Sequence, residues 1–111
     1  MKIIGYFCCS LLLVTASSFA HAEANEDAFE NGKQLHNRKC LSCHAHKSDE
    51  NANKRLYTRK DRKMTSLGGL RSQVRRCNNA LAQHLRLSED GLHDVVTYLN
   101  KEFYKFEETT D

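Results

Sequence analysis

Apolar residues recur at helical spacing in three stretches of this chain. One stretch begins near Asn25, a suitable N-cap residue, and its apolar or aromatic face is formed by Ala28, Phe29, Gly32, Leu35 and His36. The next follows Thr65 or Ser66, and its stripe at steps of three and four consists of Leu67, Leu70, Val74, Cys77 and Leu81. Both patterns predict amphipathic helices.

The third stretch has the clearest helical pattern. Ser88 is a suitable N-cap, and the acidic side chains of Glu89 and Asp90 suit the positive end of a helix. Its predicted buried face consists of Leu92, Val95, Val96, Leu99, Phe103 and Phe106. Residues 45–63 are polar and lack helical periodicity, which predicts a long surface loop with a short extended piece at residues 56–58. The predicted fold class is therefore all-α, as one small domain.

The first 22 residues have the pattern of a secretory signal peptide. Lys2 precedes an apolar run over residues 3–14, and the segment ends in Ala-His-Ala, so cleavage is expected after Ala22. The apolar run is shorter than the roughly 20 residues that cross a bilayer. We expect residues 23–111 to form an exported domain in the periplasm that does not span the membrane.

Removal of the signal peptide changes the charge and the cysteine count. The whole chain has 17 Lys and Arg against 14 Asp and Glu, and only Lys2 lies in the leader, so the mature part keeps 16 against 14, or +2. Cys40, Cys43 and Cys77 remain, an odd number that fits a disulfide framework poorly. A domain this small often depends on a metal or a cofactor for stability. The thiols therefore suggest a site.

Residues 40–44 read Cys-Leu-Ser-Cys-His, the C-x-x-C-H pattern of covalent haem attachment. The thiols of Cys40 and Cys43, three positions apart at the end of a helix, reach the two vinyl groups on one edge of the macrocycle. The imidazole of His44 then lies under the iron as its proximal ligand. Attachment of this kind takes place outside the cytoplasm, which agrees with the signal peptide. The sequence predicts one haem c per chain.

Two other uses of a C-x-x-C pair are less consistent with the chain. A structural zinc site takes four ligands, and only Cys77 and scattered histidines are available to complete one. A thioredoxin-like redox pair needs a βαβ context, which the periodicity does not show. Haem attachment is the better explanation.

With this motif, the chain resembles the small monohaem cytochromes c, from "AFENGKQLHNRKCLSCH" to "LHDVVTYLNKEFYKF". The resemblance implies an N-terminal helix with a glycine that crosses a C-terminal helix with an aromatic residue, both closing on the haem. Gly32 and Tyr98 match that pair, and close helix approach is the reason to have a glycine there. The family transfers single electrons between redox partners.

Three departures from the family pattern concern the surroundings of the haem. His36 stands where the family usually has Phe or Tyr, and Ala45 stands where a glycine is common. The chain has no proline, whereas in the familiar members a proline carbonyl accepts the N–H of the proximal imidazole. Another carbonyl must orient His44.

The sixth iron ligand is open to several interpretations. Met64 is the one methionine after the leader, lies between the motif and the last helix, and is the expected ligand. His84 is an alternative, and Cys77 is more simply explained as a buried small apolar residue. The residues around Cys77 loosely resemble high-spin, ligand-binding cytochromes c, in which an asparagine precedes the cysteine; here Asn78 and Asn79 follow it. An open sixth position is the remaining alternative.

Six cations follow the motif, and His46 and His93 are both expected to be exposed. The cations are Lys54, Arg55, Arg59, Lys60, Arg62 and Lys63. They form either a solvated loop or a docking surface that steers an acidic redox partner towards the haem edge. The compartment excludes nucleic acid as a partner.

The leading functional hypothesis is a periplasmic electron carrier that docks transiently with larger redox proteins. It is not expected to be an enzyme, because nothing in the chain supplies a general base or a substrate pocket beside the iron. One alternative is a haem protein that binds a diatomic gas at an open sixth position. Another is a dedicated haem subunit of a larger oxidoreductase.

Overall fold

The computed structural model describes residues 17–41 and 55–108, and their side chains from residue 23 onward. The long helices are α1 (Ser17–Leu35), α4 (Leu67–Ala80) and α5 (Glu89–Leu99). Shorter helical segments are η1 (His36–Cys40), η2 (Gln83–Leu85) and η3 (Asn100–Tyr104), and residues 55–58 form one further helical turn. No strand occurs in the described ranges, so the all-α prediction is confirmed.

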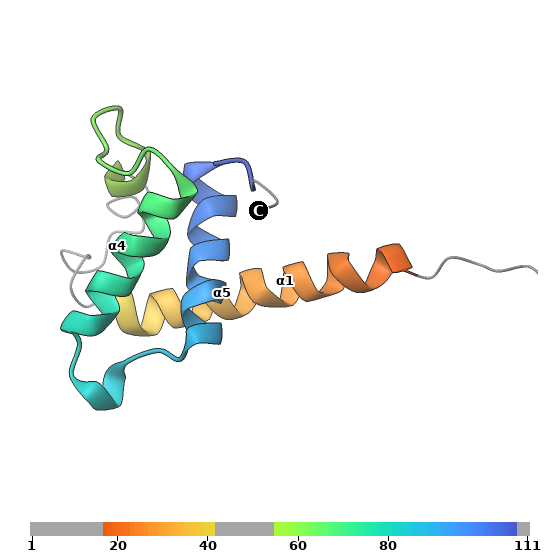
Figure 1. Ribbon diagram of the computed structural model, residues 1–111, viewed down its shortest axis with the longest axis horizontal. Coiled ribbons are helices and arrows are strands. Elements are labelled where there is room, and N and C mark those ends of the chain that lie inside the picture. Colours follow the sequence, from red (N-terminus) through yellow and green to blue (C-terminus); the bar gives the residue numbers. More distant parts are fainter. Residues whose placement is uncertain (1–16, 42–54, 109–111) are drawn as a thin grey trace, which may run out of the picture.

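Helices α1 and α4 both pack against α5. Figure 1 shows α5 crossing α1, while α4 lies beside α5, and the N-terminal half of α1 projects away from the other two helices. The buried residues at the centre are Tyr57, Leu70, Val95, Val96, Tyr98, Leu99 and Tyr104. Most of them belong to α5 and η3, which therefore form the middle of the core. In the part of the chain that is described, no helix combines the length and apolar character that crossing a bilayer takes.

The crossing of α1 and α5 depends on a glycine. A Cβ atom added at Gly32 would lie 1.9 Å from the carbonyl oxygen of Asp94 and 3.0 Å from the Cβ of Tyr98. The ring of Tyr98 packs edge-on against Phe29 with a centroid separation of 5.4 Å, and Asn31 Nδ2 donates to Asp94 Oδ2 at 2.7 Å. The predicted pairing of Gly32 with Tyr98 at a close helix crossing is confirmed.

Helix α1 begins earlier than its pattern predicted. The prediction placed its start near Asn25, but the helix begins at Ser17 and passes through the expected cleavage point after Ala22. Residues 17–24 contain no glycine or proline and three alanines, so nothing in them stops the helix. Asn25 is therefore an interior residue of α1 rather than its cap. The cleavage itself stays a prediction.

The other two long helices begin where the sequence predicted. The hydroxyl oxygen of Ser66 accepts the N–H of Gly69 at 3.0 Å, and that of Ser88 accepts the N–H of Gly91 at 3.2 Å. Both serines have extended backbone and are N-caps. Each hydroxyl oxygen accepts a helix N–H that has no partner within the helix. The predicted face of α5 is buried at Leu92, Val95, Val96 and Leu99, whereas Phe103 and Phe106 follow the end of α5 and are partly buried. On the predicted stripe of α4, Leu70 is buried and the other residues are partly buried.

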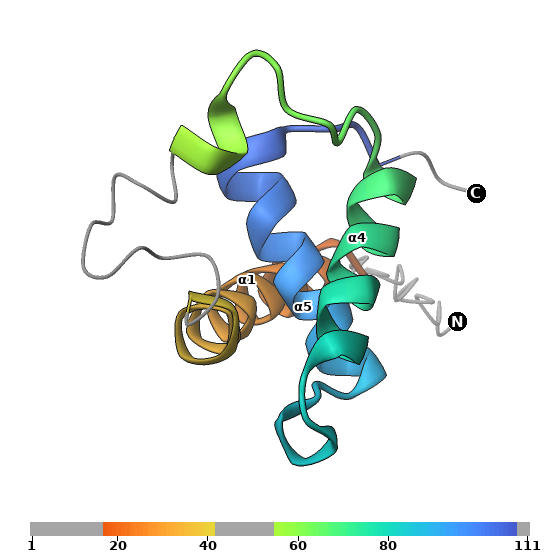
Figure 2. The same cartoon turned by 90° about the vertical axis from the view of Figure 1, so that its left-hand side faces the viewer.

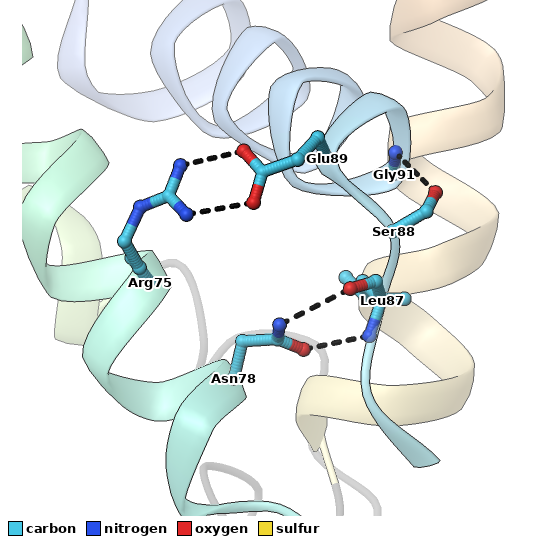
Figure 3. Close-up of polar contacts among 6 residues, drawn as sticks. All are labelled: Arg75, Asn78, Leu87, Ser88, Glu89 and Gly91. Carbon is cyan, nitrogen blue, oxygen red and sulfur yellow. Dashed lines mark hydrogen bonds and ion pairs between the residues drawn. The ribbon is translucent and has the colours of Figure 1, made fainter. Parts of the chain in front are cut away.

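Two buried asparagines hold the chain where it reverses. Asn78 donates through Nδ2 to the carbonyl of Leu87 and accepts the Leu87 N–H at Oδ1, at 3.2 and 2.7 Å (Figure 3). Asn100 makes the same pair of bonds with Phe106, at 2.9 and 2.8 Å. Lys105, which lies between Asn100 and Phe106, has a φ of 60° and so adopts the left-handed conformation typical of a helix end. Each amide thus satisfies both backbone groups of a residue that no helix satisfies.

An ion pair joins α4 to the start of α5. Arg75 donates two hydrogen bonds to Glu89, both 2.7 Å, as Figure 3 shows. This bond from Arg75 lowers the pKa of the Glu89 carboxyl, and the charge of the guanidinium adds to the effect. A lowered folded-state pKa means that the pair stabilises the fold above the unfolded pKa, about 4.3 for Glu. That contribution is lost as the pH falls through the folded pKa. Both side chains are exposed, so the effect is small.

The prediction of an extended piece at residues 56–58 is wrong. Residues 55–58 form a helical turn, which Figure 2 shows in light green beside the last turns of the blue C-terminal helix. In an extended segment, the neighbours Leu56 and Tyr57 would point to opposite faces. The helical turn lets both side chains contact the core, where Tyr57 is buried and Leu56 is partly buried. Burial of two adjacent side chains explains the helical geometry.

Replacing Gly32 by alanine is expected to destabilise the fold strongly. The added methyl group meets a backbone carbonyl rather than a flexible side chain, so the helices must separate. We expect a loss of about 3 kcal/mol or more in the free energy of unfolding, at or above the upper end for overpacking. Urea unfolding followed by circular dichroism measures this.

Gly68→Ala is the matched control, because nothing lies within 4 Å of a Cβ at that position in α4. Its stability should be unchanged or higher by about 0.5–1 kcal/mol, the gain of Ala over Gly in a helix. Equal unfolding midpoints for Gly32→Ala and the unmodified protein would contradict the account of the crossing.

Candidate functional site

Cys40, the first cysteine of the motif, lies at the end of the continuous helix that α1 and η1 form together. Five residues of wider, π-helical winding, η1, continue α1 and end at Cys40, and the N–H of Leu41 still bonds to the carbonyl of His36. Single π-helical turns of this kind occur frequently at functional sites. Cys40 is partly buried and packs against the core. The predicted partners Cys43 and His44 lie outside the described residues.

Cys40 borders a cavity of about 100 Å³ that lies between η1, the 55–58 turn, α4 and α5. Its apolar lining residues are Val74, Leu81, Leu87, Val95 and Leu99. Two sulfur-bearing side chains line it as well, Cys40 from η1 and Cys77 from α4. The site therefore combines an apolar wall with thiols from two different helices.

His36 occupies the aromatic position of the family pattern and is 2% exposed. Its Nε2 lies 2.9 Å from the Tyr57 hydroxyl, and its Nδ1 lies 3.3 Å from Asn37 Oδ1. The ring also packs against the rings of Tyr57 and Tyr98, with centroids 5.7 and 5.4 Å away. The imidazole thus fills an aromatic slot and in addition makes a buried hydrogen bond.

The hydrogen bond between His36 and Tyr57 ties the 55–58 turn to the helix that carries Cys40. Burial raises the pKa of the Tyr57 phenol, and the nearby Cys40 raises it further. The phenol therefore stays protonated at neutral pH and has a proton to donate. Sequence analysis missed this pair, because it placed Tyr57 in a polar loop. The one available signal was the apolar dipeptide of residues 56–57 amid charged neighbours.

Cys77 is positioned by its neighbour one turn earlier on α4. Gln73 Nε2 lies 3.4 Å from Cys77 Sγ and donates to it, and both residues line the cavity. Sequence analysis explained Cys77 as a buried small apolar residue, but its side chain is only partly buried and faces the cavity. The contact from Gln73 was not predicted.

The expected sixth ligand, Met64, turns inward but not towards this cavity. It is partly buried and packs against the core, and its Sδ would lie 4.0 Å from a Cβ at Gly69. Met64 is not among the described residues that line the cavity. The assignment of Met64 as a ligand stays a prediction.

The other candidate ligands are also placed by the structure. His84 is exposed on η2 and does not belong to the described cavity lining. Asn78 lines the cavity, but both ends of its amide bond to Leu87. Asn79 is exposed, as is His93, whose exposure was predicted. His46 lies outside the described residues.

Arg62, one of the six predicted surface cations, contacts the core instead of solvent alone. Arg62 is partly buried and donates to the carbonyls of Tyr57 and Tyr104, at 3.1 and 3.3 Å. Its guanidinium also lies over the rings of Tyr104 and Phe106, at 4.9 and 5.5 Å from the centroids. The prediction that Arg62 is an exposed docking cation is therefore wrong, because its side chain joins the 55–58 turn to the end of η3.

The remaining cations are exposed where they are described, while Lys54 lies outside the described residues. Arg59 pairs with Asp61 at 3.6 Å, and this carboxylate offsets part of its charge. Lys60 and Lys63 are exposed, and so is Arg55. A smaller basic surface thus remains beside the 55–58 turn.

The residues that line the cavity have the chemical character of a haem site, but the cavity is too small for a whole haem. An apolar wall suits the face of a macrocycle, and Cys40 on the same lining would be the residue that attaches to its edge. The cavity of about 100 Å³ is smaller than the roughly 300–1,000 Å³ of typical ligand sites, so its described walls match only part of a macrocycle. Residues 23–41 and 55–108 contain no group of three His, Cys, Asp or Glu arranged to hold a metal ion.

Comparison with known proteins gives no relative: no protein-family model, curated protein or solved structure matches the chain. The resemblance to the small monohaem cytochromes c therefore rests on the residues of this chain alone.

Loss of the Arg62 side chain is expected to destabilise the fold. Arg62→Ala removes charge-assisted hydrogen bonds to two carbonyls and two ring contacts, and we expect a loss of about 1–3 kcal/mol in the free energy of unfolding. Lys60→Ala, an exposed cation in the same loop, is the matched control and should stay within about 0.5 kcal/mol of the unmodified protein. Equal losses for the two variants in urea unfolding would show that Arg62 is also only a solvated charge.

Proposed function

We propose that this chain is a periplasmic c-type cytochrome with one haem, which transfers single electrons between larger redox proteins. Cys40 and Cys43 attach the haem, and His44 is the proximal iron ligand. One observation carries the proposal: the C-x-x-C-H motif begins at a cysteine that ends a helix and borders an apolar cavity. When bound, haem iron supplies a one-electron couple between its ferric and ferrous states.

The described residues have a structural part in this function. The crossing at Gly32 fixes α1 against α5, and the hydrogen bond between His36 and Tyr57 fixes the 55–58 turn against η1. These contacts hold the described residues on both sides of the motif in place. The apolar wall limits the access of water. These properties suit an electron carrier rather than an enzyme.

The exposed cations beside the 55–58 turn are proposed as a docking surface. Arg55, Arg59, Lys60 and Lys63 are exposed there, and the mature chain carries a small net positive charge. Such a surface increases the rate of association with an acidic partner, and salt reduces the effect. A membrane-bound or periplasmic redox protein with an acidic face is the partner class.

A second candidate function is the binding of a diatomic gas at the iron. The observation that favours it is the position of Met64, which is not among the described residues lining the cavity. A sixth position without a protein ligand leaves room for a small molecule. Carbon monoxide added to the ferrous protein separates the two functions, since a closed sixth position does not bind it.

The exported protein is expected to carry one covalent haem. Mass spectrometry should give the mass of residues 23–111 plus one haem, and Cys40→Ser should give a holoprotein with a single thioether bond and lower stability. Cys77→Ser is the matched control, because it removes a thiol of the same cavity that lies outside the motif, and its haem mass should be unchanged. A mass equal to that of the bare 89-residue chain would refute the proposal.

Charge reversal at the docking surface is expected to slow electron transfer with an anion. Lys60→Glu with Lys63→Glu should slow oxidation by ferricyanide several-fold at low ionic strength, and the difference should vanish near 1 M salt, where the Debye length is about 3 Å. Lys33→Glu with Arg71→Glu is the control, with the same change in net charge at exposed positions on α1 and α4. Equal slowing of both double variants in stopped-flow measurements would show that the surface has no local role.

A further inference from the structure

Tyr57 and His36 form a buried acid–base pair that the proposed electron transfer does not use. Tyr57 is 7% exposed and His36 is 2% exposed, and the Tyr57 hydroxyl oxygen lies 2.9 Å from Nε2 of His36. Burial raises the pKa of the Tyr57 phenol, and the nearby Cys40 raises it further. The phenol therefore keeps its proton and donates it in this hydrogen bond. Nε2 of His36 accepts the bond, so it is the unprotonated nitrogen of a neutral imidazole.

The other ring nitrogen of His36 also has a partner. Nδ1 lies 3.3 Å from Oδ1 of Asn37, an oxygen that can only accept a hydrogen bond. Nδ1 therefore carries the imidazole proton. If Nε2 gains a second proton, both N–H groups of the imidazolium already face an acceptor, Asn37 on one side and the oxygen of Tyr57 on the other. A buried charge whose donors are hydrogen-bonded costs much less free energy than an unpaired one.

Aromatic rings connect Tyr57 with the edge of the core. The ring centroids of Phe103 and Tyr104 lie 5.1 and 5.9 Å from that of Tyr57. Tyr104 in turn stacks on Phe106, with centroids 5.5 Å apart. Phe103 and Phe106 are only partly buried. An oxidant at the surface therefore takes an electron from the buried phenol through neighbouring rings, without entering the core.

Arg62 makes Tyr104 a poorer electron donor than Tyr57. The guanidinium carbon of Arg62 lies 4.9 Å from the centroid of the Tyr104 ring. A positive charge at this distance disfavours the loss of an electron from the ring. Tyr57, in contrast, has a base at its hydroxyl group, which can take the proton that an oxidised phenol releases. The two tyrosines are neighbours, so the oxidised state settles on Tyr57.

We propose that Tyr57 and His36 together form a one-electron donor to strong one-electron oxidants, a function that is separate from the haem. The oxidant takes one electron from the phenol, the O–H bond of Tyr57 breaks, and an N–H bond forms at Nε2 of His36. The products are a neutral tyrosyl radical and an imidazolium, so the charge of the pair rises by one. A one-electron reductant such as ascorbate restores the phenol, and the proton returns from His36.

The test generates a strong oxidant outside the protein, by flash photolysis of ruthenium tris(bipyridine) with persulfate. Persulfate keeps any attached haem ferric, and the resonance of ferric haem is distinct from that of an organic radical. Electron paramagnetic resonance of the exported protein, frozen after the flash, should show a tyrosyl radical. Transient absorption should show that this radical forms several-fold more slowly in D₂O than in H₂O, because a proton moves with the electron.

Three variants assign the radical to the pair. Tyr57→Phe keeps the ring and removes the hydroxyl group, and the radical signal should be lost. Tyr104→Phe is the matched control, because it removes the hydroxyl group of the neighbouring buried tyrosine, and the signal should remain. His36→Phe keeps an aromatic ring at position 36 and removes the base, so the radical should form several-fold more slowly. Circular dichroism checks that each variant is folded.

The proposal is overturned if Tyr57→Phe keeps the full radical signal, or if Tyr104→Phe alone removes it. It is also overturned if either His36→Phe or D₂O leaves the rate of radical formation unchanged, since the hydrogen bond is then only structural. The measurement in D₂O uses the unmodified protein and does not depend on how a variant folds. Absence of a covalent haem refutes the proposed function and leaves this proposal unaffected, because no step of it involves the haem.

Discussion

The close approach of α1 and α5 at Gly32 is the constraint on which the rest of the structure depends. Without a Cβ at this position, the α1 backbone lies against the carbonyl of Asp94, and the two helices place Phe29 and Tyr98 in contact. This crossing fixes the direction in which α1 continues into η1. The position of Cys40 at the rim of the cavity follows from it, since η1 is a direct extension of α1. A wider crossing would move the thiol away from the apolar wall formed by α4 and α5.

Buried polar contacts fix the segments that the crossing of α1 and α5 does not reach. The hydrogen bond between His36 and Tyr57 and the bonds that Arg62 donates to two carbonyls hold the 55–58 turn against η1 and η3. Asn78 and Asn100 hold the two reversals that bring α4 and the C-terminal residues against α5. The small core therefore relies on a few buried polar groups, each with a partner, to set the shape of the site. That arrangement suits a domain with limited apolar surface to bury.

The sequence predicted the elements whose signals are local. The caps at Ser66 and Ser88 and the apolar stripes of α4 and α5 follow from spacing and residue type, and the structure shows them. The glycine at the crossing was implied by the family resemblance, and the structure places it there. The burial of Tyr57 and the inward turn of Arg62 were missed. Both depend on partners 21 and 42 residues away, which local periodicity does not reveal. The start of α1 was misplaced for a different reason, because a good N-cap residue was present inside a segment that continues to favour the helix.

The proposed electron transfer depends on covalent attachment of haem to Cys40 and Cys43. Extraction of the exported protein with acidified acetone tests this most directly, because the solvent removes haem held by iron ligation but leaves haem held by thioether bonds. We predict that the haem absorption stays with the precipitated protein, and that it moves to the solvent when both cysteines are replaced by serine. Haem in the solvent phase from the unmodified protein, or no haem in either phase, would contradict the account.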